Sequence, residues 1–158
     1  MKPLPHDYEV DLTGGAQGYA TISAVGLPEL TTAPPREYDG PGDAWSPEHL
    51  LLASVSSCFL FTFRAVAKAS QADFVDVDAR TWGQVTRAGG VTRFSEIVVH
   101  ATVTAAPGSN VESLQRAIDR TTAHCLVSSS LVTTVRVEAV IRAAGAAVSA
   151  TGNYKKTA

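Results

Sequence analysis

The chain has 158 residues, of which 45% are hydrophobic, so it is long enough for one domain with a sizeable core and too short to favour two. Thirteen Lys and Arg against fifteen Asp and Glu give a net charge of −2 without a basic block, which excludes the electrostatic basis of nucleic-acid binding. The N-terminal residues lack the charged segment and apolar run of a secretory signal, and we therefore expect a cytoplasmic protein.

The first 43 residues predict three strands and a loop. The strands show alternating or β-branched residues between glycine- and proline-rich turns, and we expect them at 8–12, 19–25 and 30–33. Pro34 and Pro35 must end the third strand because proline has no N–H to donate to a sheet. Residues 36–43 are charged and rich in Gly and Pro, which indicates a shaped loop.

Residues 45–70 predict a long helix that is apolar on all sides. Ser46 is a suitable N-cap, Pro47 fits the first helical position, and Glu48 suits the positive end of the helix dipole. Apolar residues then occur around the whole circumference, whereas a surface helix shows one apolar stripe. Polar residues interrupt the apolar run, so we expect a core helix and no membrane span.

The second half of the chain predicts a hairpin, a helix and a last strand. The expected ranges are strands at 74–86 and 91–105, a helix from 110 to about 124 and a strand at 131–141. We predict one domain over residues 1–142 and a loose C-terminal tail over 143–158, where apolar bulk is scarce.

This order of elements predicts an α+β fold with antiparallel sheets. A single sheet cannot enclose a helix that is apolar on all sides, so a second copy of the chain is the simplest cover. We therefore expect a homodimer.

The two cysteines, Cys58 in the long helix and Cys125, serve either packing or redox chemistry in a reducing compartment. Packing is the simpler interpretation, because free cysteine is among the most buried residue types. Zinc is an alternative, with Cys58, Cys125, His124 and either His49 or His100 as ligands, but no closely spaced ligand pair supports it. We expect no cofactor and no metal.

Two segments together resemble a known family. PPREYDGPGDAWSPEHLLLASVSSCF at 34–59 and HCLVSSSL at 124–131 are similar to the paired signature of the OsmC/Ohr family of thiol-dependent peroxidases. In that family a Pro-Glu pair opens the long helix, small residues lead to a first cysteine followed by Phe, and a second cysteine precedes Val-Ser. Part of the family carries its essential arginine in the turn between the first two strands, but residues 14–18 of this chain contain none, which points to the OsmC-like branch. In addition, Leu126 stands where proline commonly follows the second cysteine.

The resemblance implies an OsmC-like fold, an intertwined homodimer and a role for four residues. Cys58 corresponds to the peroxidatic cysteine and Cys125 to the resolving one, while Arg36 and Glu48 correspond to the charged pair that activates Cys58. Without the resemblance, Glu48 is an ordinary first-turn carboxylate and Arg36 a solvated loop charge. The implied activity is reduction of organic hydroperoxides through a thiol–disulfide cycle, with a dithiol reductant such as a lipoyl group.

Phe59, Phe61 and Phe63 suggest an apolar substrate lining, which favours alkyl or lipid hydroperoxides. The alternative is a non-catalytic dimer of the same fold that binds a small apolar ligand and keeps its cysteines buried.

Helix geometry adds a constraint on the site. Glu48 and Cys58 are ten residues apart, or about 15 Å along one helix, which a glutamate side chain cannot span. No helix breaker lies between them. We therefore predict two sites at the dimer interface, with Cys58 and Cys125 from one chain and Arg36 and Glu48 from the other.

Overall fold

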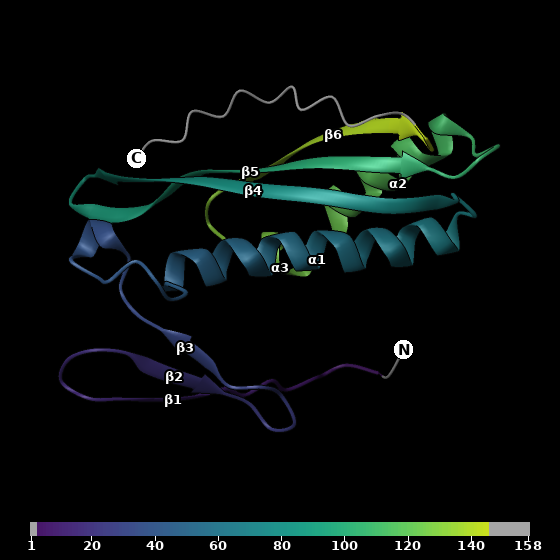
Figure 1. The fold of residues 1–158 in the computed structure, drawn as a ribbon. Helices are drawn as coiled ribbons and strands as arrows, with labels where there is room; N and C mark the ends of the chain where they lie inside the picture. Colours follow the sequence, from purple (N-terminus) through teal and green to yellow (C-terminus); the bar gives the residue numbers. More distant parts are fainter. Residues whose placement is uncertain (1–2, 146–158) are drawn as a thin grey trace. The chain divides into compact units, whose positions relative to one another are not determined.

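The computed structural model describes residues 3–145, and it contains every predicted strand and helix (Figure 1). Its elements are β1 (Asp11–Gly14), β2 (Ala20–Ser23), β3 (Leu30–Thr32), the 3-10 helix η1 (Arg36–Tyr38), α1 (Pro47–Ala69), β4 (Phe74–Ala88), β5 (Val91–Ala105), α2 (Val111–His124), α3 (Leu126–Ser129) and β6 (Val135–Ala143). The short helices η1 and α3 were not predicted. Most of the predicted tail, residues 146–158, lies outside the described residues.

The described part of the chain divides into two compact units, an N-terminal one that ends at Ser54 and a C-terminal one that begins at Val55, and the division falls inside α1. The boundaries predicted for a single domain, 1–142, stay a prediction. Each unit is described by itself.

The N-terminal unit is an antiparallel sheet in the order β1-β2-β3, followed by the start of α1. Hydrogen bonds connect the residues just before α1 to the end of β3. The Trp45 carbonyl accepts bonds from the Thr32 hydroxyl at 2.6 Å and from the Ala33 N–H at 3.0 Å. The predicted N-cap is confirmed: the fully buried Ser46 accepts a bond from the His49 N–H at 3.3 Å through its hydroxyl.

The C-terminal unit is built on a second sheet in the order β4-β5-β6. β4 and β5 form the predicted long hairpin, and Gly89 and Gly90 make its turn with φ of 58° and 80°, which glycine adopts without strain. β6 pairs with β5 in parallel, so the expectation of purely antiparallel sheets is wrong for this pair. The reason is that α2 carries the chain back along the sheet before β6 begins, as parallel pairing requires.

The core of the C-terminal unit lies between this sheet and the two long helices (Figure 1). It contains Phe63 and Ala67 of α1, Leu114 and Ile118 of α2, and Val103 of β5, all at most 3% exposed. One face of the sheet thus packs against both helices. The opposite face carries charged side chains, among them Arg136, which pairs with Glu96 and Glu138.

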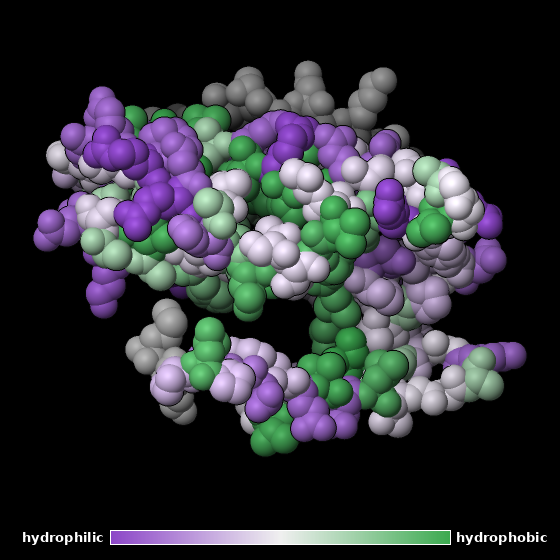
Figure 2. All heavy atoms as spheres, turned by 180° about the vertical axis from the view of Figure 1, so that it is seen from behind, coloured by the Kyte–Doolittle hydropathy of each residue, from purple (hydrophilic) through white to green (hydrophobic). Residues whose placement is uncertain are grey.

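The long helix α1 is less enclosed in one chain than its composition predicts. Its buried residues are Val55, Phe59, Phe63 and Ala67, which are four apart and form one stripe, whereas Phe61 is 60% exposed. By length and hydropathy alone α1 could cross a membrane, but a core helix has the same properties. The hydropathy surface also shows apolar patches on the N-terminal unit (Figure 2), where Leu12 is 68% exposed.

Candidate functional site

Cys58 and Cys125 lie together in the C-terminal unit. Cys58 is a half-buried residue near the middle of α1, and Cys125 is a buried residue between α2 and α3. Both are free thiols, and the Cys125 side chain hydrogen-bonds to Cys58. The Val127 N–H also donates to the Cys58 sulfur, at 3.5 Å. The structure therefore brings together the two cysteines that the sequence singled out.

The surroundings of Cys58 favour its thiolate. Burial raises the pKa of the Cys58 thiol, but hydrogen bonds from the Val127 N–H, the Cys125 side chain, the Thr62 hydroxyl and the Leu126 N–H lower it, and the pKa ends below its ordinary value. A thiolate is the reactive form of cysteine, so Cys58 has the properties of a nucleophile.

The surroundings of Cys125, in contrast, favour its protonated thiol. Burial raises the pKa of the Cys125 thiol, the side chain and N–H of Ser128 lower it, and neighbouring Cys58 raises it, so that the pKa lies above its ordinary value. Cys125 therefore stays protonated where Cys58 is ionised. A protonated thiol beside a thiolate can donate a hydrogen bond to it.

Arg36 belongs to the N-terminal unit and begins η1, where it is exposed. Its side chain lies against Gly42, which has a φ of +75°, and a Cβ at this position would overlap the Arg36 side chain. Two features therefore favour glycine at position 42: the positive φ, and the space that the missing Cβ leaves for the Arg36 side chain. Sequence reasoning missed this role, although the Gly-Pro-Gly sequence at 40–42 was a signal for it.

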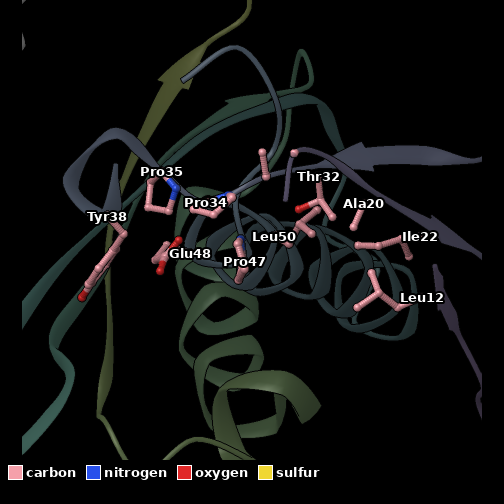
Figure 3. A pocket seen from close by; sticks show the side chains of 12 residues that line it. Leu12, Ala20, Ile22, Thr32, Pro34, Pro35, Tyr38, Pro47, Glu48 and Leu50 are labelled. Carbon is pink, nitrogen blue, oxygen red and sulfur yellow. The ribbon is translucent and has the colours of Figure 1, made fainter. Parts of the chain in front are cut away.

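Glu48 lies in the first turn of α1 and lines a pocket of about 570 Å³ within the N-terminal unit (Figure 3). The rest of the lining is mainly apolar and comes from the three strands, the loop after β3 and the start of α1: Leu12, Gly18, Ala20, Ile22, Thr32, Ala33, Pro34, Pro35, Tyr38, Pro47 and Leu50. The Glu48 Oε2 is shielded from solvent and has no hydrogen-bond partner among the described residues. A buried carboxylate oxygen of this kind favours a positively charged or hydrogen-donating partner.

The predicted pairing of Arg36 with Glu48 stays a prediction. Within residues 3–145 the structure records no ion pair between these two side chains. α1 runs without a break from Pro47 to Ala69, as expected, so Glu48 and Cys58 of one chain are about 15 Å apart along its axis.

The three phenylalanines proposed as a substrate lining lie in different environments. Phe59 and Phe63 are 2% and 0% exposed and stack on each other with ring centroids 6.2 Å apart. Phe61 is exposed and has the Arg64 guanidinium 5.5 Å from its ring. The packing accounts for Phe59 and Phe63 as core residues, and the lining role stays a prediction.

The zinc alternative finds no support. Across the described part of the chain, no three His, Cys, Asp or Glu side chains lie close enough together to hold a metal ion. His124 ends α2 next to Cys125 and is exposed.

Comparison with known proteins identifies the family. The family model described as OsmC-like protein matches residues 40–140, which include α1, both cysteines, β4, β5 and the first part of β6. The chain belongs to the OsmC-like family. The resemblance noted from the two sequence segments is thereby confirmed.

OsmC-like proteins of known structure share the fold. An OsmC-like protein of unknown function from Vibrio cholerae has a TM-score of 0.79 at 15% identity, covering 86% of this chain and 100% of its own. An organic hydroperoxide resistance protein from Legionella pneumophila has a TM-score of 0.69 at 23% identity, covering 88% of this chain and 98% of its own. The uncharacterized protein YmaD of Bacillus subtilis is 24% identical over 107 residues, which are 66% of this chain and 71% of YmaD. The predicted α+β, OsmC-like fold is confirmed.

Proposed function

We propose that this OsmC-like protein is a thiol-dependent peroxidase that reduces organic hydroperoxides. The observation that carries the proposal is the pair of contacting thiols whose pKa values are displaced in opposite directions, Cys58 downward and Cys125 upward. A reactive thiolate beside a protonated second thiol is what a two-cysteine peroxidase needs. The structural likeness to hydroperoxide resistance proteins from Legionella pneumophila and Elizabethkingia anophelis agrees with this activity.

The reaction begins with attack of the Cys58 thiolate on the O–O bond of the hydroperoxide. The sulfur takes the terminal oxygen and becomes a sulfenic acid, while the alkoxide leaves and is protonated to the alcohol. The Cys125 thiol then attacks the Cys58 sulfur, which forms the disulfide and releases the hydroxyl as water. A dithiol reductant, such as a lipoyl group in the cytoplasm, then reduces the disulfide by thiol–disulfide exchange. The reductant becomes a disulfide, and both cysteines return to thiols.

The active unit of this proposal is a homodimer with two shared sites. Cys58 and Cys125 come from one chain, and Arg36 and Glu48 come from the other. Three observations support this arrangement: the unbroken helix between Glu48 and Cys58, the shielded Glu48 oxygen in an open pocket, and the apolar residues that α1 leaves exposed. Arg36 would stabilise the thiolate by its charge, and Glu48 would hold the guanidinium in a paired geometry.

Single cysteine substitutions test the peroxidase. Cys58→Ser abolishes consumption of cumene hydroperoxide, because no thiolate is left to attack the O–O bond. Cys125→Ser consumes one equivalent and then stops, because the sulfenic acid has no resolving thiol. The measurement is loss of hydroperoxide per protein, without added thiol for the single turnover of Cys125→Ser, because an external thiol can itself reduce a sulfenic acid, and with excess dithiol for multiple turnover. Multi-turnover activity of Cys58→Ser equal to that of the wild type contradicts the proposal.

A second candidate function is supported by the pocket that Glu48 lines. Its volume of about 570 Å³ and mainly apolar walls are typical of sites for small apolar ligands, so a non-catalytic binding protein is the alternative. Counting free thiols after treatment with cumene hydroperoxide separates the two functions. A peroxidase loses both thiols to the disulfide, whereas a binding protein with structural cysteines keeps them.

A further inference from the structure

The hydroxyl of Thr62 lies beside the Cys58 sulfur, whereas several hydroxyls in and just after the helices bond to the backbone one turn earlier. Ser70, Thr121 and Thr122 each donate to the backbone carbonyl four residues earlier, at 2.7, 2.7 and 3.1 Å. This is the usual local bond of a hydroxyl within a helix. Thr62 lies one turn after Cys58 on α1, and its Oγ1 lies 3.9 Å from the Cys58 sulfur.

A hydroxyl in this place distinguishes the two ionisation states of Cys58. A thiolate only accepts hydrogen bonds, so the Thr62 hydroxyl must donate to it, and bonds to charged acceptors are the stronger ones. A neutral thiol is a weak acceptor and gains less from the same hydroxyl. The Thr62 hydroxyl therefore shifts the equilibrium toward the thiolate.

We propose that Thr62 is a positioning residue of the proposed peroxidase, whose hydroxyl donates to the Cys58 thiolate and keeps it ionised. It shares this task with the Val127 N–H, which donates to the same sulfur at 3.5 Å. Both donors belong to the C-terminal unit of the same chain as Cys58. The catalytic meaning of this role rests on the proposed function, but the effect on the ionisation of Cys58 does not.

The test compares two substitutions of similar size. Thr62→Val replaces the hydroxyl by a methyl group, and Thr62→Ser keeps the hydroxyl and removes a methyl group. Both are made in a Cys125→Ser background, so that Cys58 is the only thiol of the chain. The rate of Cys58 alkylation by iodoacetamide is measured as a function of pH, with circular dichroism as the check of folding.

Thr62→Val moves the midpoint of the pH profile upward and slows alkylation below that midpoint by roughly threefold to tenfold, because a donor to a charged acceptor is lost. Thr62→Ser keeps the profile of the parent. An unchanged profile in Thr62→Val, or an equal shift in both variants, overturns the inference. Should Thr62→Val not fold, Thr62→Ala removes the same hydroxyl and gives the same comparison.

Failure of this inference is distinguishable from failure of the proposed function, since alkylation needs no hydroperoxide. A shifted profile in a protein that consumes no hydroperoxide keeps the role of Thr62 in ionising Cys58 and rejects the peroxidase. An unshifted profile in an active peroxidase rejects the role of Thr62 alone.

Discussion

The two cysteines differ in acidity although both are shielded from water to some extent. Burial alone raises the pKa of each thiol, and only Cys58 has enough hydrogen-bond donors to reverse this effect. Its donors are the Thr62 hydroxyl in α1, the Cys125 side chain, and the backbone N–H groups of the two residues after Cys125. The difference in acidity favours Cys58 over Cys125 as the nucleophile of the proposed reaction, on grounds independent of any related protein.

This difference predicts distinct pH profiles for the two thiols. In the single-cysteine variants Cys125→Ser and Cys58→Ser, iodoacetamide alkylation of Cys58 has its midpoint at a lower pH than that of Cys125, because the pKa of Cys58 is lowered and that of Cys125 is raised. A lowered pKa means that the thiolate persists as the pH falls, so Cys58 stays reactive near neutral pH and Cys125 does not. Mass spectrometry of the alkylated protein gives the rates. Equal midpoints, or the reverse order, would refute the assignment of roles.

Not all of these residues could be found from the sequence. Cys58 and Cys125 stand out because the chain has only two cysteines and both occur in recognisable segments. Thr62 could be found in principle, since residues four apart share a helix face. Val127 and Leu126 could not, because they act through backbone N–H groups that every residue except proline supplies.

The short helix α3 is the element that connects Cys125 to the environment of Cys58. It begins directly after Cys125, the Val127 N–H donates to the Cys58 sulfur at 3.5 Å, and the Leu126 N–H is a further cause that lowers the pKa of this thiol. Leu126 occupies the first helical position, which tolerates proline. Cys125 has φ −69° and ψ 111°, a conformation that a residue before proline favours.

Leu126→Pro therefore removes one N–H donor with little other change to the backbone. We expect it to raise the pKa of Cys58 and to slow Cys58 alkylation at neutral pH by about threefold, the size expected for one weak bond to a charged group. Leu126→Ala is the matched control: it keeps the N–H and removes a side chain that is 69% exposed. The measurement is the alkylation profile in the Cys125→Ser background, and identical profiles for the two variants would show that this N–H has no effect.

Most elements could be predicted because their ends have strong local signals, such as Ser46-Pro47 before α1 and Gly89-Gly90 between β4 and β5. The parallel direction of β6 has no such signal. It depends on where α2 delivers the chain, which is a property of tertiary packing. The helix η1, three residues long, is also beyond what periodicity can reveal.

At the scale of the molecule, the main prediction is that Arg36 and Glu48 act on the cysteines of the other subunit. The composition of α1 led to the expectation of a dimer, and its exposed apolar residues agree with that expectation. The arrangement of two chains cannot be read from one sequence, because it depends on which surfaces fit each other.

A mixed dimer tests the shared site. One chain carries Cys58→Ser, and the other carries Arg36→Ala with Glu48→Ala, each with a different affinity tag. If the sites are shared, one of the two sites keeps all four residues and stays active, whereas both parent homodimers are inactive or strongly impaired. Hydroperoxide consumption by the purified heterodimer is the measurement. A mixed dimer as inactive as a mixture of its parents would place all four residues within one chain.

The Arg36 side chain packs closely on Gly42, so the residue that evolution can accept at position 42 depends on the residue at position 36. Any residue other than glycine at 42 would need an unfavourable backbone conformation and would displace the Arg36 side chain. A lineage that keeps its arginine in this loop is therefore bound to keep the glycine six residues later. Where the arginine lies in another part of the chain, only the backbone conformation of residue 42 still favours glycine, so substitutions at position 42 should be tolerated more readily there than beside Arg36.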